Sequence, residues 1–148
     1  MKILVSRCLL GEPCRYDGAS KPVEWVQALE EKGYTLIPVC PEVEGGLSTP
    51  RLPAEVQPDG RVVNREGTDV TAQYLAGAER ALELARVHGC TTAILKEKSP
   101  SCGSMQIYDG SFTGTLIRRQ GVTAGLLIRN GIRVLGESSV QELLNKDK

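Results

Sequence analysis

Residues 2–6, Lys-Ile-Leu-Val-Ser, form a short apolar run of the kind that predicts a buried strand. Similar runs follow at 35–39 (Thr-Leu-Ile-Pro-Val), 92–95 (Thr-Ala-Ile-Leu) and 132–135 (Ile-Arg-Val-Leu). Nearly continuous apolar runs are typical of parallel strands that helices cover on both faces. We therefore expect these four segments to be the strands of one sheet.

The segments between these strands have helical spacing. The clearest helix is predicted over about 69–88, ended by Gly89. Its apolar residues recur at helical intervals: Val70, Tyr74, Leu75, Ala78, Leu82 and Ala85. Further helices are expected at about 21–32, 121–130 and 138–146. The order is mostly βαβαβ, which predicts an α/β protein: a single-domain, three-layer, Rossmann-like fold with a mostly parallel sheet.

The remaining segments are rich in turn residues. Val56 to Asn64 is predicted to form a hairpin that turns at Pro58-Asp59-Gly60. Residues 40–51 and 96–110 are expected to be loops. No repeat or linker divides the chain, so we expect residues 1–148 to form one domain.

Composition and charge narrow the class of protein. Lys+Arg and Asp+Glu both number 18, which argues against nucleic acid as the main partner, and aromatic residues make up only 4%. No apolar run approaches the ~20 residues of a membrane span, and the apolar start at Met1–Val5 is too short for a signal peptide. A cytoplasmic protein with reduced thiols is expected, its oligomeric state left open.

Three of the five cysteines stand at equivalent places. Cys8, Cys40 and Cys102 each come shortly after a predicted strand. In an open parallel sheet, ligands bind at the carboxyl ends of the strands, so these thiols should meet at one edge. Cys90 precedes its strand and should lie at the opposite edge, whereas Cys14 follows Cys8 on the same loop and could reach the site. We expect the three thiols to hold a metal centre.

The residues alone leave the kind of metal centre open. Thiolates suit both zinc and iron–sulfur clusters. The single imidazole, His88, ends a helix at the wrong edge and is not expected to be a ligand. A site of four cysteines that includes Cys14 would be closed, either structural or an electron carrier, whereas three cysteines would leave one metal position open to substrate.

Side chains near these cysteines are candidates for chemistry. Glu42 lies two residues past Cys40 and is a better candidate acid/base than Glu44. Ser99 or Ser101, just before Cys102, could orient a substrate or relay a proton. The loop residues Arg15, Tyr16 and Asp17 offer donors, a ring and an acceptor, as binding of a planar heterocycle requires.

The same stretches resemble a bacterial family of short domains that includes the thiouracil desulfidases. The resemblance extends from residue 2 to about 136. Its motifs lie at 5–11, 14–18, 39–42, 45–47, 49–51, 95–103 and 107–110. It implies a [4Fe–4S] cluster held by Cys8, Cys40 and Cys102, with the fourth iron open to the sulfur of a thiolated pyrimidine. It also implies roles for a Glu and a Ser, matched here to Glu42 and Ser101.

We therefore expect an iron–sulfur-dependent desulfidase whose substrate is a small thiolated nucleobase or nucleoside, of the thiouracil or 4-thiouridine type. Hydrolysis of the carbon–sulfur bond would release the uracil form and sulfide. Two other functions stay open: a non-enzymatic protein with a closed four-cysteine metal site, and a sulfurtransferase that passes the sulfur to an acceptor.

Overall fold

In the computed structural model, which describes residues 1–10 and 25–144, the four apolar runs form a parallel sheet. The strands are β1 (Lys2–Ser6), β2 (Thr35–Val39), β5 (Thr92–Leu95) and β8 (Arg133–Gly136). Their order in the sheet is β2-β1-β5-β8, and each neighbouring pair is parallel. The predicted strands are confirmed, with β8 displaced by one residue.

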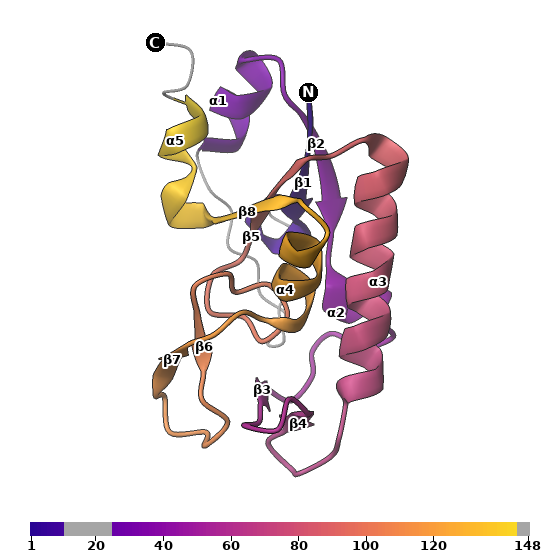
Figure 1. Ribbon diagram of the computed structural model, residues 1–148, viewed down its shortest axis with the longest axis vertical. Helices are drawn as coiled ribbons and strands as arrows, with labels where there is room; N and C mark the ends of the chain where they lie inside the picture. Colours follow the sequence, from indigo (N-terminus) through magenta and orange to yellow (C-terminus); the bar gives the residue numbers. More distant parts are fainter. Residues whose placement is uncertain (11–24, 145–148) are drawn as a thin grey trace.

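Helices cover both faces of this sheet (Figure 1). Alternate side chains of a strand point to opposite faces. Leu4 accordingly packs with α3 (Thr71–His88) and α4 (Val122–Arg129), whereas Ile3 and Val5 pack with α1 (Trp25–Glu31) and α5 (Gln141–Leu144). The predicted three-layer α/β fold is confirmed.

The helices expected at about 69–88 and 121–130 are confirmed as α3 and α4. Helix α3 ends at Gly89, whose left-handed φ of 69° suits glycine. The start of the helix expected at 21–32 lies outside the described residues. The helix expected over 138–146 is instead a 3₁₀ turn, η2 (Glu137–Ser139), followed by the short α5.

Two expected loops contain regular structure. A short helix, α2 (Pro41–Glu44), follows β2 directly, because Pro41 has the φ of a first helical residue and Cys40 is extended before it. The segment after β5 contains an antiparallel hairpin, β6 (Gln106–Tyr108) and β7 (Leu116–Arg118), which the sequence did not predict. Its strands of three residues are too short to give an alternating pattern.

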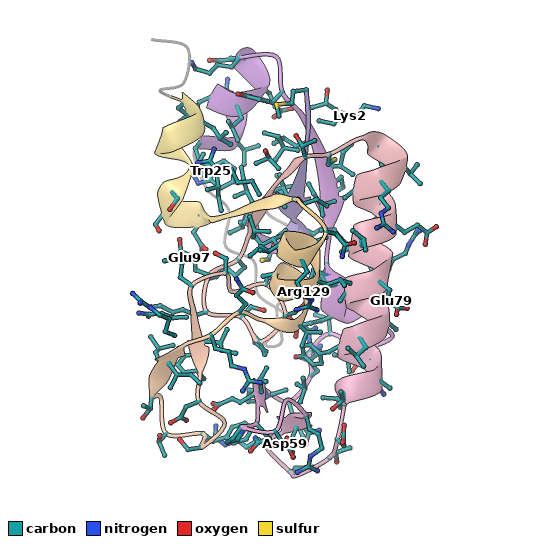
Figure 2. All side chains as sticks on the ribbon, in the orientation of Figure 1. Lys2, Trp25, Asp59, Glu79, Glu97 and Arg129 are labelled. Atoms are coloured by element: carbon teal, nitrogen blue, oxygen red, sulfur yellow. The ribbon has the colours of Figure 1, made fainter. Side chains whose placement is uncertain are left out.

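Two hairpins lie beyond the carboxyl edge of the sheet (Figure 1). The predicted hairpin is β3 (Ala54–Val56) and β4 (Val62–Asn64), and it begins two residues earlier than expected. Figure 2 shows Lys2, at the start of β1, and Asp59, in the β3–β4 turn, near opposite ends of the long axis. Within residues 1–10 and 25–144, no helix has the length and apolar character to cross a membrane.

Candidate active site

A cavity of about 820 Å³ lies where β1, β2 and β5 end. Its lining includes all three cysteines singled out from the sequence, Cys8, Cys40 and Cys102. Each comes from a different strand end: Cys8 from the 3₁₀ turn η1 (Arg7–Leu10), Cys40 from the N-cap of α2, and Cys102 from the turn after β5. The carboxyl ends of parallel strands meet at one edge of the sheet, and this strand-end rule brings together three thiols that are up to 94 positions apart in sequence.

The turn that carries Cys102 is fastened to the start of α4. Backbone N–H groups of Val122 and Thr123 donate to the carbonyls of Pro100 and Ser101, at 2.9 Å each. Gly121 packs so closely on Ser101 that a Cβ there would lie 2.6 Å from its carbonyl oxygen. The first turn of α4 thus fixes the backbone around Cys102.

Cys102 belongs to the apolar cluster between the sheet and helices α3 and α4, and polar groups reach it from the cavity side. The hydroxyl of Ser6 accepts a hydrogen bond from the backbone N–H of Lys96 at 2.9 Å and donates to the sulfur of Cys102 at 3.8 Å. Burial, together with the charges of Glu42 and Cys40, raises the pKa of Cys102 to about 12. The thiol therefore keeps its proton at neutral pH until a positive centre favours the thiolate.

The donor set fits an iron–sulfur cluster, since three buried thiols face one cavity and thiolates are the ligands such clusters take. In the part of the chain that the structure describes, no three His, Cys, Asp or Glu side chains converge as ligands of a single metal ion. Cys14, the candidate fourth ligand, lies outside the described residues.

Glu42 lies in the lining of the same cavity, on α2. One carboxylate oxygen, Oε2, accepts hydrogen bonds from Arg51 Nε at 3.2 Å and from the Tyr74 hydroxyl at 2.8 Å. The other oxygen, Oε1, faces the hydroxyl of Ser99 at 3.4 Å. Glu44 points elsewhere: it pairs with Arg80 at 3.5 Å and does not contribute to the cavity lining.

The two serines before Cys102 occupy different surroundings. Ser101 is fully buried, and its hydroxyl is hydrogen-bonded to that of Thr123 at 2.7 Å. Ser99 lines the cavity, and its oxygen accepts the backbone N–H groups of Ser101 and Cys102 at 3.1 Å each. With its oxygen occupied by these donors, the Ser99 hydroxyl proton is left to donate to Glu42.

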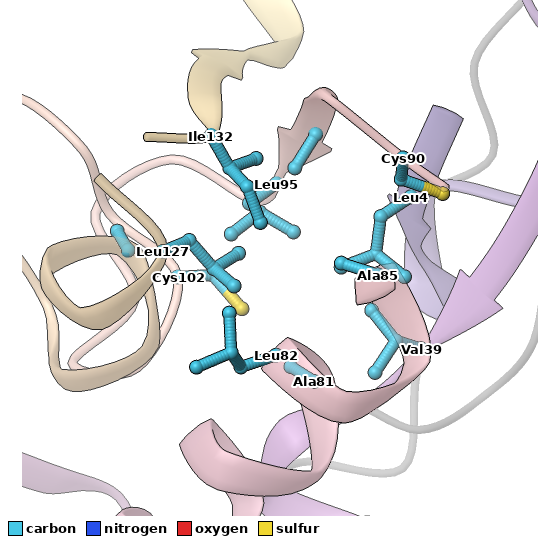
Figure 3. Close-up of a cluster of buried hydrophobic side chains, with 12 residues drawn as sticks. Leu4, Val39, Ala81, Leu82, Ala85, Cys90, Leu95, Cys102, Leu127 and Ile132 are labelled. Carbon is cyan, nitrogen blue, oxygen red and sulfur yellow. The ribbon is translucent and has the colours of Figure 1, made fainter. Parts of the chain in front are cut away.

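The remaining residues singled out from the sequence fall into two groups. Arg15, Tyr16 and Asp17 are outside the described residues. Cys90 precedes β5 and is buried in the apolar cluster beside α3, and Figure 3 shows it near Leu4 and Ala85, apart from Cys102. His88 is the last residue of α3, at the same amino-terminal edge of the sheet as Cys90.

Tyr74 and Arg51 are site residues whose roles the sequence did not predict. Tyr74 belongs to the apolar stripe of α3, and that pattern indicates a core residue. Arg51 lies in the motif at 49–51, and the motif by itself indicates no role for it. Burial and the neighbouring Glu42 carboxylate raise the pKa of Tyr74, so its hydroxyl stays protonated as a donor to Glu42.

The far wall of the cavity is built by the β6–β7 connection. The buried carboxylate of Glu55 accepts the backbone N–H groups of Gly110 and Phe112 at 3.0 and 3.1 Å. Phe112 has a φ of 57°, unusual for a bulky residue, and the Arg65 guanidinium lies 5.9 Å from the centre of its ring. Phe112 and Arg65 both line the cavity.

Comparison with known proteins agrees with this geometry. A family model described as 2-thiouracil desulfurase matches residues 3–139. The uncharacterized protein YbbK of Bacillus subtilis (strain 168) is 41% identical over 151 residues, which cover 96% of this chain and 99% of that protein. A solved structure of the [4Fe-4S]-dependent thiouracil desulfidase TudS is 51% identical, with a TM-score of 0.90 over 96% of this chain and 94% of that chain.

Proposed function

Because the chain belongs to the 2-thiouracil desulfurase family, we propose that it is a [4Fe–4S]-dependent desulfidase of thiouracil. Thiouracil and water are converted to uracil and hydrogen sulfide, without a change of redox state. The observation that carries this proposal is the meeting of three thiols and one carboxylate in a single cavity. We prefer an iron–sulfur cluster to a zinc ion at these thiols because the related desulfidase TudS is [4Fe-4S]-dependent.

Cys8, Cys40 and Cys102 are the residues that would hold the cluster. When bound by three protein ligands, the cluster would supply a Lewis acid for the sulfur of the substrate. Ser6 and the start of α4 hold the Cys102 turn in place at this site.

Glu42 is the group that we propose to move protons. Its Oε1 takes a proton from the attacking water and passes a proton on to the leaving group, so that both protons of the water end on hydrogen sulfide. Ser99, which donates to the same oxygen, holds it toward the cavity. Ser101, the serine chosen from the sequence to orient the base, has its hydroxyl on Thr123, so we propose that it acts through the backbone of the Cys102 turn.

The substrate is a small thiolated pyrimidine, and we extend the proposal to 4-thiouridine as a nucleoside of the same chemistry. Arg15, Tyr16 and Asp17 stay proposed substrate contacts. The cytoplasm, where thiols are kept reduced, is the compartment that we propose for an enzyme with this cysteine set.

The test is anaerobic turnover of 2-thiouracil by the parent chain and by Glu42→Gln, which keeps the side-chain shape and removes the titrating proton. General acid–base catalysis contributes about 10²–10⁴-fold, so the loss of sulfide release should fall in that range. Glu44→Gln is the matched control, and it should turn over like the parent because Glu44 faces Arg80.

Three results would contradict the proposal. Full activity of Glu42→Gln, with the cluster verified by iron and sulfide content, would exclude Glu42 as the proton carrier. Sulfide release that requires an added sulfur acceptor would indicate a sulfurtransferase. One zinc per chain without acid-labile sulfide would indicate a closed structural site.

A further inference from the structure

The two oxygens of the Glu42 carboxylate are held in different ways. Among the described side chains, Oε2 is contacted by Arg51 through Nε at 3.2 Å and Nη2 at 3.1 Å, and by the Tyr74 hydroxyl at 2.8 Å. Oε1 faces the longer Ser99 contact of 3.4 Å. Oε2 is therefore held by the Arg51 guanidinium and the Tyr74 hydroxyl, whereas Oε1 faces the Ser99 hydroxyl.

This anchor is buried, although it comes from three separate parts of the chain. The side chain of Arg51 is 8% exposed and that of Glu42 is 14% exposed, while Tyr74 as a residue is 2% exposed. A buried ion pair gains little stability over apolar residues of similar size, because removing its charges from water is costly. The contribution of the Arg51–Glu42 pair to the stability of the fold is therefore a weak explanation for its burial at this cavity.

Close backbone contact brings Tyr74 within reach of Glu42. Helices α2 and α3 touch where Gly45 faces the carbonyl of Gln73 and Gly77 faces the carbonyl of Pro41. A Cβ on either glycine would lie 1.9 Å from the facing oxygen. Both positions thus require glycine, and the close approach sets the distance from the Tyr74 hydroxyl to the carboxylate.

We propose that Tyr74 and Arg51 are positioning residues that immobilise Oε2 of Glu42, so that Oε1 alone is presented to water and substrate. This inference rests on the proposed function, since it specifies how Glu42 is oriented for proton transfer. The syn or anti approach of a carboxylate depends on its rotation, and two donors on one oxygen fix that rotation. Tyr74 and Arg51 act through Glu42 and need not touch the substrate.

The decisive experiment is a double-mutant cycle between Tyr74→Phe and Glu42→Gln. Tyr74→Phe removes one hydroxyl and keeps the ring in the core. In the parent chain it should lower kcat about 10- to 100-fold and leave KM within about twofold, because misorientation affects the chemical step. In the Glu42→Gln background the same change should cost less than about twofold, because the carboxylate it orients is gone.

The cluster content and the substrate affinity of each variant are measured separately from its turnover. Iron and acid-labile sulfide content, the cluster absorbance and the affinity for 2-thiouracil should match the parent in Tyr74→Phe. Tyr34→Phe, which removes a tyrosine hydroxyl at the opposite edge of the sheet, is the matched control and should leave kcat unchanged. Arg51→Lys should retain more kcat than Arg51→Met, since lysine restores a cation beside Oε2.

The outcomes separate the two proposals. If Glu42→Gln is inactive while Tyr74→Phe turns over like the parent, the positioning role is wrong and the proposed function stands. Equal losses of kcat in both backgrounds, or a loss that follows cluster content, would assign Tyr74 a structural role and overturn the inference. If Tyr74→Phe does not fold, the same cycle with Arg51→Met and Arg51→Lys decides, and equal kcat for these two overturns it.

Discussion

Cys90 and Cys102 stand at opposite ends of β5 and are buried in the same apolar cluster, yet polar groups reach only Cys102 among the contacts of the described residues. Cys90 packs against Leu4 and Ala85 in an apolar cluster, where burial raises its pKa. Cys102 is equally buried, but it accepts a hydrogen bond from Ser6 and shares a cavity with Glu42. Burial of a cysteine thus says little about its function, whereas the polar groups that accompany it distinguish a ligand from a core residue.

The strongest test of this contrast is to remove each thiol in turn. Cys102→Ala, like Cys8→Ala and Cys40→Ala, should abolish the cluster and all sulfide release, because two thiols cannot hold it in place. Cys90→Ala should keep the cluster and lower stability by about 1 kcal/mol, the usual cost of a small core truncation. The measurements are iron and acid-labile sulfide after anaerobic reconstitution. A colourless Cys90→Ala protein would refute the distinction.

A second test makes the same substitution at the two edges. Gly77→Ala places a Cβ 1.9 Å from the Pro41 carbonyl oxygen and should destabilise the fold by at least about 3 kcal/mol. Gly89→Ala meets no atom within 4 Å and only forces alanine into a left-handed conformation, at about 1 kcal/mol. Thermal unfolding should show the larger drop in Tm for Gly77→Ala. Equal drops would show that the α2–α3 contact can relax.

A third test uses pH at the carboxyl edge. Partial burial acts to raise the pKa of Glu97, but hydrogen bonds from the Ser138 hydroxyl and backbone N–H, with the charges of Lys96 and Lys98, outweigh it and lower that pKa below its usual 4.5. A lowered folded-state pKa contributes stability above the unfolded value, and this stability is lost as the pH falls through the folded value.

Ser138→Ala should therefore lower stability at pH 7 by about 0.5 kcal/mol, a small effect because solvent screens this half-exposed pair. The deficit should shrink below pH 4.5 as Glu97 is protonated in both states. Urea unfolding at pH 7 and at pH 3.5 measures it, with Ser139→Ala as the neighbouring control. A deficit that is the same at both pH values would mean that the Glu97 charge is not involved.

The smallest effect is expected for Cys14→Ser. If Cys8, Cys40 and Cys102 hold the cluster, removal of Cys14 should leave iron content unchanged and most of the turnover intact. Anaerobic iron analysis and 2-thiouracil turnover measure both. Loss of iron in this variant would instead favour a closed four-cysteine site.

Local patterns account for what could be predicted. The four strands are apolar runs, and the strand-end rule needs only their positions to bring Cys8, Cys40 and Cys102 together. The β6–β7 hairpin could not be predicted, because its short strands lie in a polar, glycine-containing segment. The role of Tyr74 could not be predicted either. A tyrosine in an apolar helical stripe indicates a core position, and its partner Glu42 is 32 residues away in sequence.

The choice between Ser99 and Ser101 also lay beyond the sequence. Both flank Pro100, and either hydroxyl could face the site. The backbone of the turn determines which serine faces Glu42. The Ser99 oxygen accepts hydrogen bonds from two backbone N–H groups, and its hydroxyl proton is then directed at Glu42. Such a choice depends on the path of the backbone, which residue type and spacing do not determine.

The hydrogen bonds between α4 and the Cys102 turn have a consequence for assembly of the enzyme. Carbonyls of Pro100 and Ser101 are already paired with N–H groups of α4, so this ligand-bearing turn has its shape from the polypeptide alone. The conformational entropy of ordering this turn is offset by its contacts with α4 and need not be offset by cluster binding. We therefore expect insertion of the cluster to leave the backbone of this turn unchanged, so that a molecule bleached by air regains its cluster without refolding of the turn.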